Sequence, residues 1–173
     1  IKCRIFNEFR PFLSTAQNNR DHRKILVIDG TTAFNGGVNL ADEYINEKER
    51  FGHWKDTAVM LKGEAVWSFT VMFIQMWEWK TKQLSDYEKY RPANISQFNR
   101  ISEGYVLPYG DSPTDNEPVG ELVYLNIINK AQKYVYITTP YLVIDNEMIT
   151  ALGFAVKSGV DVKIIVPHIA DKW

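Results

Sequence analysis

The sequence lacks the patterns that mark several common classes of protein. One cysteine in 173 residues excludes an intrachain disulfide, and we interpret Cys3 as a small apolar residue on a buried strand. No uninterrupted apolar run reaches 18 residues, the length that indicates a membrane-spanning helix. There is no cysteine–histidine zinc spacing, no glycine-rich nucleotide loop and no Gly-x-Ser-x-Gly elbow. We therefore expect neither a metal nor an organic cofactor.

The sequence also lacks a strong charge of either sign. The net charge of −1 predicts no overall attraction to nucleic acid, and an apolar content of 45% is ordinary for a chain that buries a core. The first 24 residues are an exception, because they hold six basic and two acidic side chains. Two interpretations fit this local excess: a solvated face, or attraction to an anionic lipid surface or phosphate group.

A cluster of polar residues suited to phosphate chemistry follows this basic region. The sequence HRKILVID places His22, Lys24 and Asp29 in a His-x-Lys-x4-Asp pattern, and the sequence GGVN then brings Gly37 and Asn39. A histidine can attack phosphorus or carry a proton near neutral pH. Lysine and asparagine can hold the non-bridging oxygens while charge shifts, and the aspartate can orient or balance the cations.

Strand geometry predicts that these residues lie near one another. Residues 24–29 read as a buried strand that ends at Asp-Gly, and residues 33–38 read as its hairpin partner. His22 and Lys24 share a face because side chains alternate along a strand. Two positions of the turn are possible. In one, the numbers of the paired residues add to 61, and in the other they add to 59. Both place Asn39 within about one residue pair of His22.

These residues and several later stretches resemble the HKD signature of the phospholipase D superfamily, and in particular its bacterial cardiolipin synthase branch. The matching stretches are residues 19–24 (NRDHRK), 27–30 (VIDG), 36–44 (GGVNLADEY), 51–57 (FGHWKDT), 63–66 (GEAV), 139–141 (TPY) and 158–163 (SGVDVK). The likeness covers nearly the whole chain.

The resemblance implies a two-step, metal-independent phosphatidyl transfer through a phosphohistidine. It makes His22 either the nucleophile or the acid and base, and the sequence leaves this choice open. It makes Lys24 and Asn39 phosphate ligands, with Gly37 allowing close approach, and it makes Asp29 the carboxylate of the motif.

Two further residues have two interpretations each. Glu43 is either a partner of a catalytic histidine or a carboxylate at the start of a helix. Tyr141 follows Thr-Pro after a predicted strand, where ligands gather in such sheets, or it simply packs beside a turn proline.

The family pattern needs a second HKD motif, and the sequence lacks one. His53 is followed two residues later by lysine, but Met60 stands where the aspartate should be, and His168 has no such lysine. We interpret both as structural residues. We therefore expect an internal piece of a longer enzyme, whose second motif comes from the same parent chain or from a second copy in a homodimer.

The pattern of apolar residues predicts an α/β fold, a phospholipase D-like mixed sheet flanked by helices. Residues 1–90 are expected to form the back of a first half, residues 91–104 a linker and residues 105–173 the front of a second half. The elements expected are strands at 1–6, 24–29, 33–38, 54–62, 105–109, 133–138 and 161–166, a helical turn at 39–44, and helices at 64–84, 119–132 and 146–157. The helix at 64–84 is either a core helix with aromatic packing or an interfacial helix that touches a membrane.

Three functions are open from the sequence. The first is a fragment of a bacterial membrane enzyme that transfers a phosphatidyl group between two phosphatidylglycerol molecules and releases glycerol. The second is a phospholipase or nuclease that uses water at the same site, although the charge balance favours lipid over nucleic acid. The third is a catalytically incomplete fold that binds phosphate or phospholipid. The piece itself is expected to be soluble and inactive alone.

Overall fold

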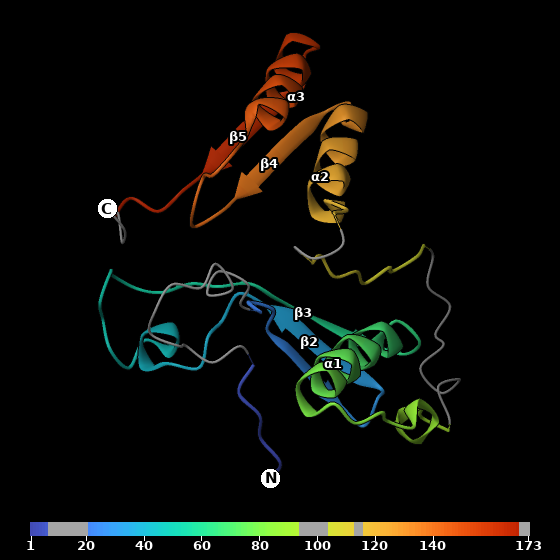
Figure 1. The fold of residues 1–173 in the computed structure, drawn as a ribbon. Helices are drawn as coiled ribbons and strands as arrows, with labels where there is room; N and C mark the ends of the chain where they lie inside the picture. Colours follow the sequence, from blue (N-terminus) through green and yellow to red (C-terminus); the bar gives the residue numbers. More distant parts are fainter. Residues whose placement is uncertain (7–20, 94–103, 113–115, 170–173) are drawn as a thin grey trace, which may run out of the picture. The chain divides into compact units, whose positions relative to one another are not determined.

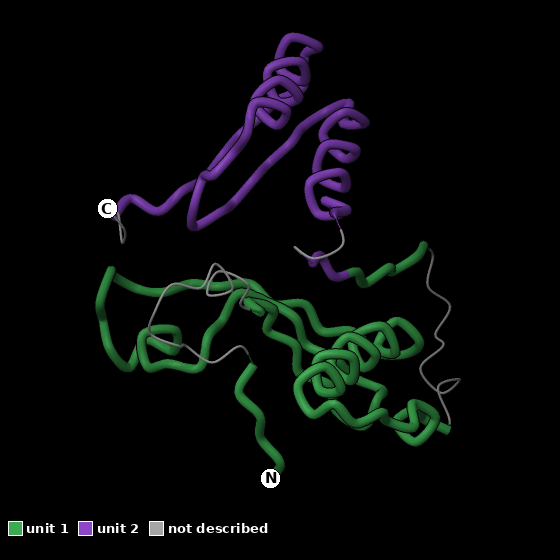
Figure 2. The backbone as a smooth tube through the Cα atoms, viewed as in Figure 1, with its two compact units in different colours: residues 1–109 green, residues 110–173 purple. Residues whose placement is uncertain are grey.

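The computed structural model describes residues 1–6, 21–93, 104–112 and 116–169. The chain divides into two compact units, residues 1–109 and 110–173 (Figure 2). Most of the predicted linker lies outside the described residues, so the assignment of the two units to two halves of a larger enzyme remains a prediction. The structure confirms the mixed α/β class.

Unit 1 is built on a three-stranded antiparallel sheet with the order β1-β2-β3. The strands are β1 (Ile25–Ile28), β2 (Thr32–Gly36) and β3 (Ala58–Lys62). Two short 3-10 helices, η2 (Asp42–Ile45) and η3 (Tyr87–Tyr90), lie outside the sheet. β3 begins four residues later than predicted.

The hairpin between β1 and β2 has neither of the predicted registers. Ile25 pairs with Asn35, so that partner numbers add to 60. The backbone N–H of Thr31 donates to the Ile28 carbonyl at 3.1 Å, and Asp29 and Gly30 both have positive φ, at 53° and 64°. Positive φ at both central residues is what a type I′ turn requires. Thr31 then adds one residue before the ladder resumes, which accounts for the shifted register.

Helix α1 (Val66–Thr81) lies against one face of this sheet (Figure 1). Val66 and Phe69 are buried with Ala33 of β2, and the partly buried side chains around them are Ile25, Val27, Leu61 and Met72. Elsewhere along α1, Phe73 and Trp79 are more than half exposed. The core interpretation of this helix is therefore right for one of its faces. No helix in the described part of the chain is long and apolar enough to cross a membrane.

Unit 2 contains α2 (Val119–Lys130), β4 (Tyr134–Thr138), α3 (Asn146–Lys157) and β5 (Asp161–Ile165). β4 and β5 are parallel and α3 connects them, as the pattern predicted. Both helices and both strands of this unit contribute to one core. Its buried members are Ile128, Val135, Ala151, Leu152, Ala155 and Val160.

The bounds of α3 are those predicted, because both of its ends carry strong local signals. The Asp145 carboxylate accepts the backbone N–H of Met148 at 2.8 Å, an N-cap bond. At the other end Gly159 has φ 89°, and the N–H groups of Gly159 and Val160 donate to the carbonyls of Val156 and Ala155. These are the two bonds of a Schellman motif.

Two predicted strands are wrong. Residues 1–6 and 105–109 have no regular structure, because neither segment has a strand partner among the described residues and an unpaired strand makes no ladder bonds. The helices of each unit pack against a single face of that unit's sheet.

Candidate active site

The candidate site begins at the extended segment that leads into β1. Lys24 donates its Nζ to the backbone carbonyl of His22 at 2.7 Å, and the Asn35 amide holds the Lys24 carbonyl at 3.2 Å. The imidazole of His22 belongs to an exposed residue, while Lys24 is half-buried. The approach to β1 therefore offers an accessible imidazole with an ammonium anchored beside it.

Burial lowers the pKa of Lys24, and the charges of Asp21 and Asp56 act in the opposite direction. Asp56 thus supplies a negative field at Lys24 from outside the motif.

Asp56 is fixed by two hydrogen bonds at the entrance to β3. Its Oδ2 accepts the Trp54 indole N–H at 3.3 Å, and its Oδ1 accepts the backbone N–H of Thr57 at 2.7 Å. The same carboxylate presses against Gly37, where a Cβ atom would lie 2.6 Å from Oδ1. A larger residue at position 37 would therefore collide with the Asp56 carboxylate, which gives a steric reason for the glycine.

Asn39 belongs to the same network through aromatic residues. Its Nδ2 donates to the Tyr44 hydroxyl at 2.6 Å, and the Tyr44 ring meets the Trp54 ring edge-on with centroids 4.7 Å apart. The Asn46 side chain clamps the Trp54 backbone, with Oδ1 accepting the Trp54 N–H at 2.6 Å and Nδ2 donating to its carbonyl at 2.9 Å. Trp54 is thus the common support of Asn39 and Asp56.

Within unit 1, no contact of the described residues joins Asp29 or Glu43 to this cluster. Asp29 lies in the turn at the far end of β1, roughly 16 Å along the strand from Lys24 at about 3.3 Å per residue. Glu43 lies in the first turn of η2, and no hydrogen bond or ion pair of the described residues joins it to His22. Tyr141 is in unit 2, in a turn where its backbone N–H and carbonyl both contact the Thr139 hydroxyl.

The two remaining histidines lie outside this network. His53 and His168 are exposed. Among the residues that the structure describes, no group of three His, Cys, Asp or Glu side chains could hold a metal ion.

Sequence reasoning missed the roles of Asp56, Tyr44 and Trp54. The signal was present as the Trp-x-Asp stretch, which matched the family but received no chemical role. Its position follows from the pairing of Gly36 with Ala58, which brings the residues before β3 beside Gly37, the residue after β2. The segment therefore offers an ammonium, an amide and an exposed imidazole, which are the kinds of group that bind phosphate oxygens and carry protons.

Comparison with known proteins agrees with the resemblance. Residues 124–173 match the family model described as the phospholipase D-like domain of cardiolipin synthase. A protein of Streptococcus mutans without an assigned function is 61% identical over 99% of this chain and 37% of its own length. The cardiolipin synthases of Alkalihalophilus pseudofirmus and of a Geobacillus species are 36% and 38% identical, over 94% of this chain and 32% of theirs.

No solved structure gives a significant match. The chain spans about a third of the length of the curated relatives that it matches. The chain is therefore similar over nearly its whole length, in both units, to cardiolipin synthases, and residues 124–173 match the phospholipase D-like domain of that family.

Proposed function

We propose that the chain supplies one histidine-lysine-asparagine half of the active site of a cardiolipin synthase. The observation that carries this proposal is the network of hydrogen bonds and rings that joins Asn39, Tyr44, Trp54 and Asp56, together with the charge of Asp56 that acts on Lys24. Such a network holds the Asn39 amide in place before the substrate arrives, as electrostatic catalysis requires.

In the proposed reaction one imidazole attacks the phosphorus of phosphatidylglycerol. The bond between phosphorus and the glycerol oxygen breaks, and the imidazole of the other half gives that oxygen its proton. The hydroxyl of a second phosphatidylglycerol then loses its proton to the same base and attacks phosphorus. The phosphorus–nitrogen bond breaks and cardiolipin forms. Both roles stay open for His22.

Lys24, Asn39 and Gly37 have different tasks in this proposal. The Lys24 ammonium and the Asn39 amide hold the non-bridging oxygens as negative charge develops on them. Gly37 leaves room for Asp56, whose negative charge favours the charged form of Lys24. Asp29 has a structural task, because it adopts the positive φ that the turn between β1 and β2 requires. The second imidazole comes from another segment of the parent protein or from a second copy, and the parent acts at an anionic phospholipid membrane.

The test is a transfer assay with the full-length protein that contains this chain, using phosphatidylglycerol vesicles and measuring cardiolipin, glycerol and phosphatidic acid. We expect cardiolipin and glycerol in equal amounts, with loss of nearly all transfer in His22→Ala and a drop of at least about 100-fold in Lys24→Ala. His53→Ala is the matched control and should keep most of the transfer.

Each alternative has its own outcome in this assay. Phosphatidic acid as the main product would replace the transferase by a hydrolase. Near-normal transfer by His22→Ala would remove that residue from the chemistry. Binding of phosphatidylglycerol without any product from the full-length protein would favour a phospholipid-binding fold that has lost turnover.

A further inference from the structure

The hydroxyl group of Tyr44 has a role in the structure that leaves its hydrogen available. The Asn39 Nδ2 donates to the Tyr44 oxygen at 2.6 Å, so the hydroxyl is the acceptor in this bond. A phenolic hydroxyl can accept one hydrogen bond and donate another at the same time. Within the part of the chain that the structure describes, the Tyr44 hydroxyl makes no second hydrogen bond. Its hydrogen can therefore serve a ligand.

The other members of the network do not take this hydrogen. The Asp56 carboxylate accepts the Trp54 indole N–H at Oδ2 and the Thr57 backbone N–H at Oδ1. The indole of Trp54 can only donate. The surroundings of Tyr44 therefore give it a donor and a ring contact, but no acceptor.

The Tyr44 side chain is held in place before any ligand arrives. Its ring meets the Trp54 ring at an interplanar angle of 67°, with centroids 4.7 Å apart. Its backbone N–H donates to the Ala41 carbonyl at 3.1 Å, at the start of η2. Asn46 in turn holds both the N–H and the carbonyl of Trp54. A donor that is fixed in this way loses little conformational freedom when it binds.

The donors that remain on Asn39 and Tyr44 suit an anion with two acceptor oxygens. Asn39 keeps its second amide N–H, and Tyr44 keeps its O–H. The two N–H groups of an amide diverge, so the second N–H and the Tyr44 hydroxyl point to different oxygens. A phosphodiester presents two non-bridging oxygens that share one negative charge. The bond from Asn39 also strengthens Tyr44 as a donor, because linked hydrogen bonds polarise one another.

We propose that Tyr44 is a further phosphate-binding residue, whose hydroxyl donates to one non-bridging oxygen of the phosphodiester while the second N–H of Asn39 donates to the other. The proposal rests on the proposed function for the identity of the substrate, and it adds a neutral donor to that site. Tyr44 then touches the substrate itself instead of acting only through Asn39. Its bond to the oxygen strengthens as negative charge develops there during transfer.

The test measures binding to the full-length protein that contains this chain, by calorimetric titration. The probe is a dihexanoyl phosphonate analogue of phosphatidylglycerol, in which a methylene group replaces the bridging oxygen of the leaving glycerol, so that glycerol cannot be released. Two further probes carry sulfur in place of one or the other non-bridging oxygen. Sulfur is a weak hydrogen-bond acceptor, so each sulfur probe should bind about tenfold less tightly than the oxygen probe.

Tyr44→Phe keeps the ring beside Trp54 and removes only the hydroxyl. The oxygen probe should then bind about tenfold less tightly, which is the loss of one hydrogen bond to a charged group. One sulfur probe should lose no further affinity in this variant, because the acceptor that it lacks no longer has a donor. The other sulfur probe should still bind more weakly than the oxygen probe, since the Asn39 N–H remains.

Two control variants separate contact with the substrate from support of the site. Tyr87→Phe removes a hydroxyl of unit 1 that donates to Glu78 at 3.0 Å, outside the network, and should change no Kd. Asn46→Ala releases the backbone of Trp54 and should weaken the binding of all three probes by the same factor. If Tyr44→Phe also weakened all three probes equally, the hydroxyl would only orient Asn39 and the proposal would be overturned. An unchanged Kd in Tyr44→Phe would overturn it too.

The proposal about Tyr44 and the proposed function can fail separately. Loss of the effect of sulfur at one oxygen in Tyr44→Phe supports the contact even if the transfer assay yields phosphatidic acid or no product. Cardiolipin formation, combined with an effect of sulfur that Tyr44→Phe leaves intact at both oxygens, would refute the role of Tyr44 and keep the transferase. A full-length protein that binds none of the three probes would refute both.

Discussion

Replacing Asp56 by asparagine removes one charge from the candidate active site and keeps the shape of the side chain. The two carboxylate oxygens accept one donor each, the Trp54 indole N–H and the Thr57 backbone N–H. An amide has one acceptor oxygen, so one of these donors loses its partner. For a half-buried pair the expected cost is about 1–2 kcal/mol of unfolding free energy. In a unit of this size that lowers the Tm by about 5–10 °C.

The same substitution acts on Lys24 through charge. Asp56 now opposes the effect of burial on the Lys24 pKa, so asparagine at position 56 should lower that pKa further. A double-mutant cycle with Lys24→Gln isolates the electrostatic interaction between Asp56 and Lys24. We expect a coupling free energy of about 0.5–1 kcal/mol, which is modest because Lys24 is partly solvated. Turnover by the full-length protein should fall about 10- to 100-fold, since the support of Asn39 loosens as well.

The measurement is urea and thermal unfolding of the 173-residue chain by circular dichroism, with the NMR-detected pKa of Lys24. Glu49→Gln is the control, because it removes one charge from an exposed residue in the same loop. If Asp56→Asn and Glu49→Gln gave the same Tm, and the cycle with Lys24 gave no coupling, the network would not hold the site.

Gly37→Ala perturbs the same carboxylate without changing any charge. Its Cβ would lie 2.6 and 3.0 Å from the two oxygens of Asp56 and must displace them. We expect a loss of turnover similar to that of Asp56→Asn. Gly153→Ala is the control, because a Cβ there meets nothing within 4 Å and alanine favours helix α3 by about 0.5–1 kcal/mol. Equal turnover in both alanine variants would refute the steric argument.

Three other predictions concern single features. Asp29→Asn should keep turnover, because asparagine suits a type I′ turn. Asp29→Val should lower the Tm by several degrees. A large loss of turnover in Asp29→Asn with an unchanged Tm would instead give Asp29 a catalytic role. The hydrogen bonds of Asp161 and Tyr136 raise the pKa of Lys163 to about 12, so Asp161→Asn should lower it toward 10.5 in an NMR titration. This interaction stabilises unit 2 below pH 10.5 and is lost as the pH rises through about 12; an unchanged Lys163 pKa in the variant would contradict it. Leu152→Ala should cost about 2–4 kcal/mol in the core of unit 2, and correlation spectra should show unit 2 signals broadening while those of unit 1 persist.

The parts of the fold that the sequence predicted are those with local signals. α3 was predicted from its first to its last residue because its cap and its terminal glycine lie in the sequence itself. The hairpin was predicted but its register was wrong, since the extra residue Thr31 depends on a backbone hydrogen bond and not on composition. Residues 1–6 read as a strand because they alternate and are apolar, but strand formation needs a partner that composition does not name.

The candidate site likewise contains residues that a local motif points to and one residue that only strand pairing brings near. His22, Lys24, Gly37 and Asn39 stand close together in the sequence, so motif and spacing identified them. Asp56 reaches Gly37 only through the pairing of β2 with β3. A prediction of the register between β2 and β3 would have placed Trp54 and Asp56 near Gly37 and so shown the role of Asp56.

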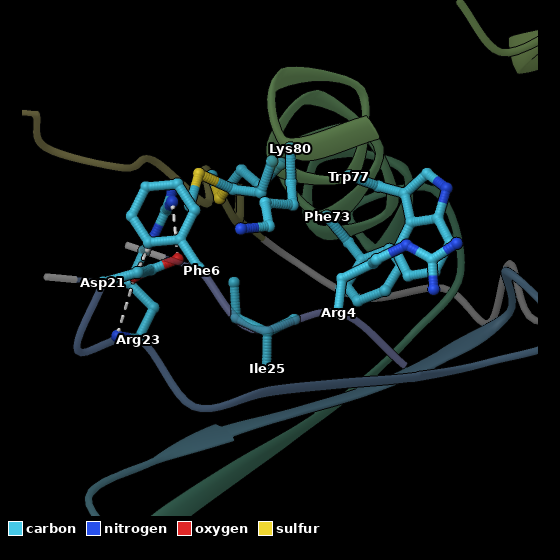
Figure 3. Close-up of a pocket in the computed structure, with 10 residues that line it drawn as sticks. Arg4, Phe6, Asp21, Arg23, Ile25, Phe73, Trp77 and Lys80 are labelled. Carbon is cyan, nitrogen blue, oxygen red and sulfur yellow. Dashed lines mark hydrogen bonds and ion pairs between the residues drawn. The ribbon is translucent and has the colours of Figure 1, made fainter. Parts of the chain in front are cut away.

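Asp21 links two neighbouring cations in the segment before β1. It accepts hydrogen bonds from Arg23 at 2.9 and 3.0 Å (Figure 3), and its charge also acts on Lys24. A substitution at Arg23 would release the charge of Asp21 and so act on Lys24 as well. A loss of turnover in an Arg23 variant would therefore not show that Arg23 itself contacts the substrate, whereas a loss in Lys24→Ala reports on Lys24 directly.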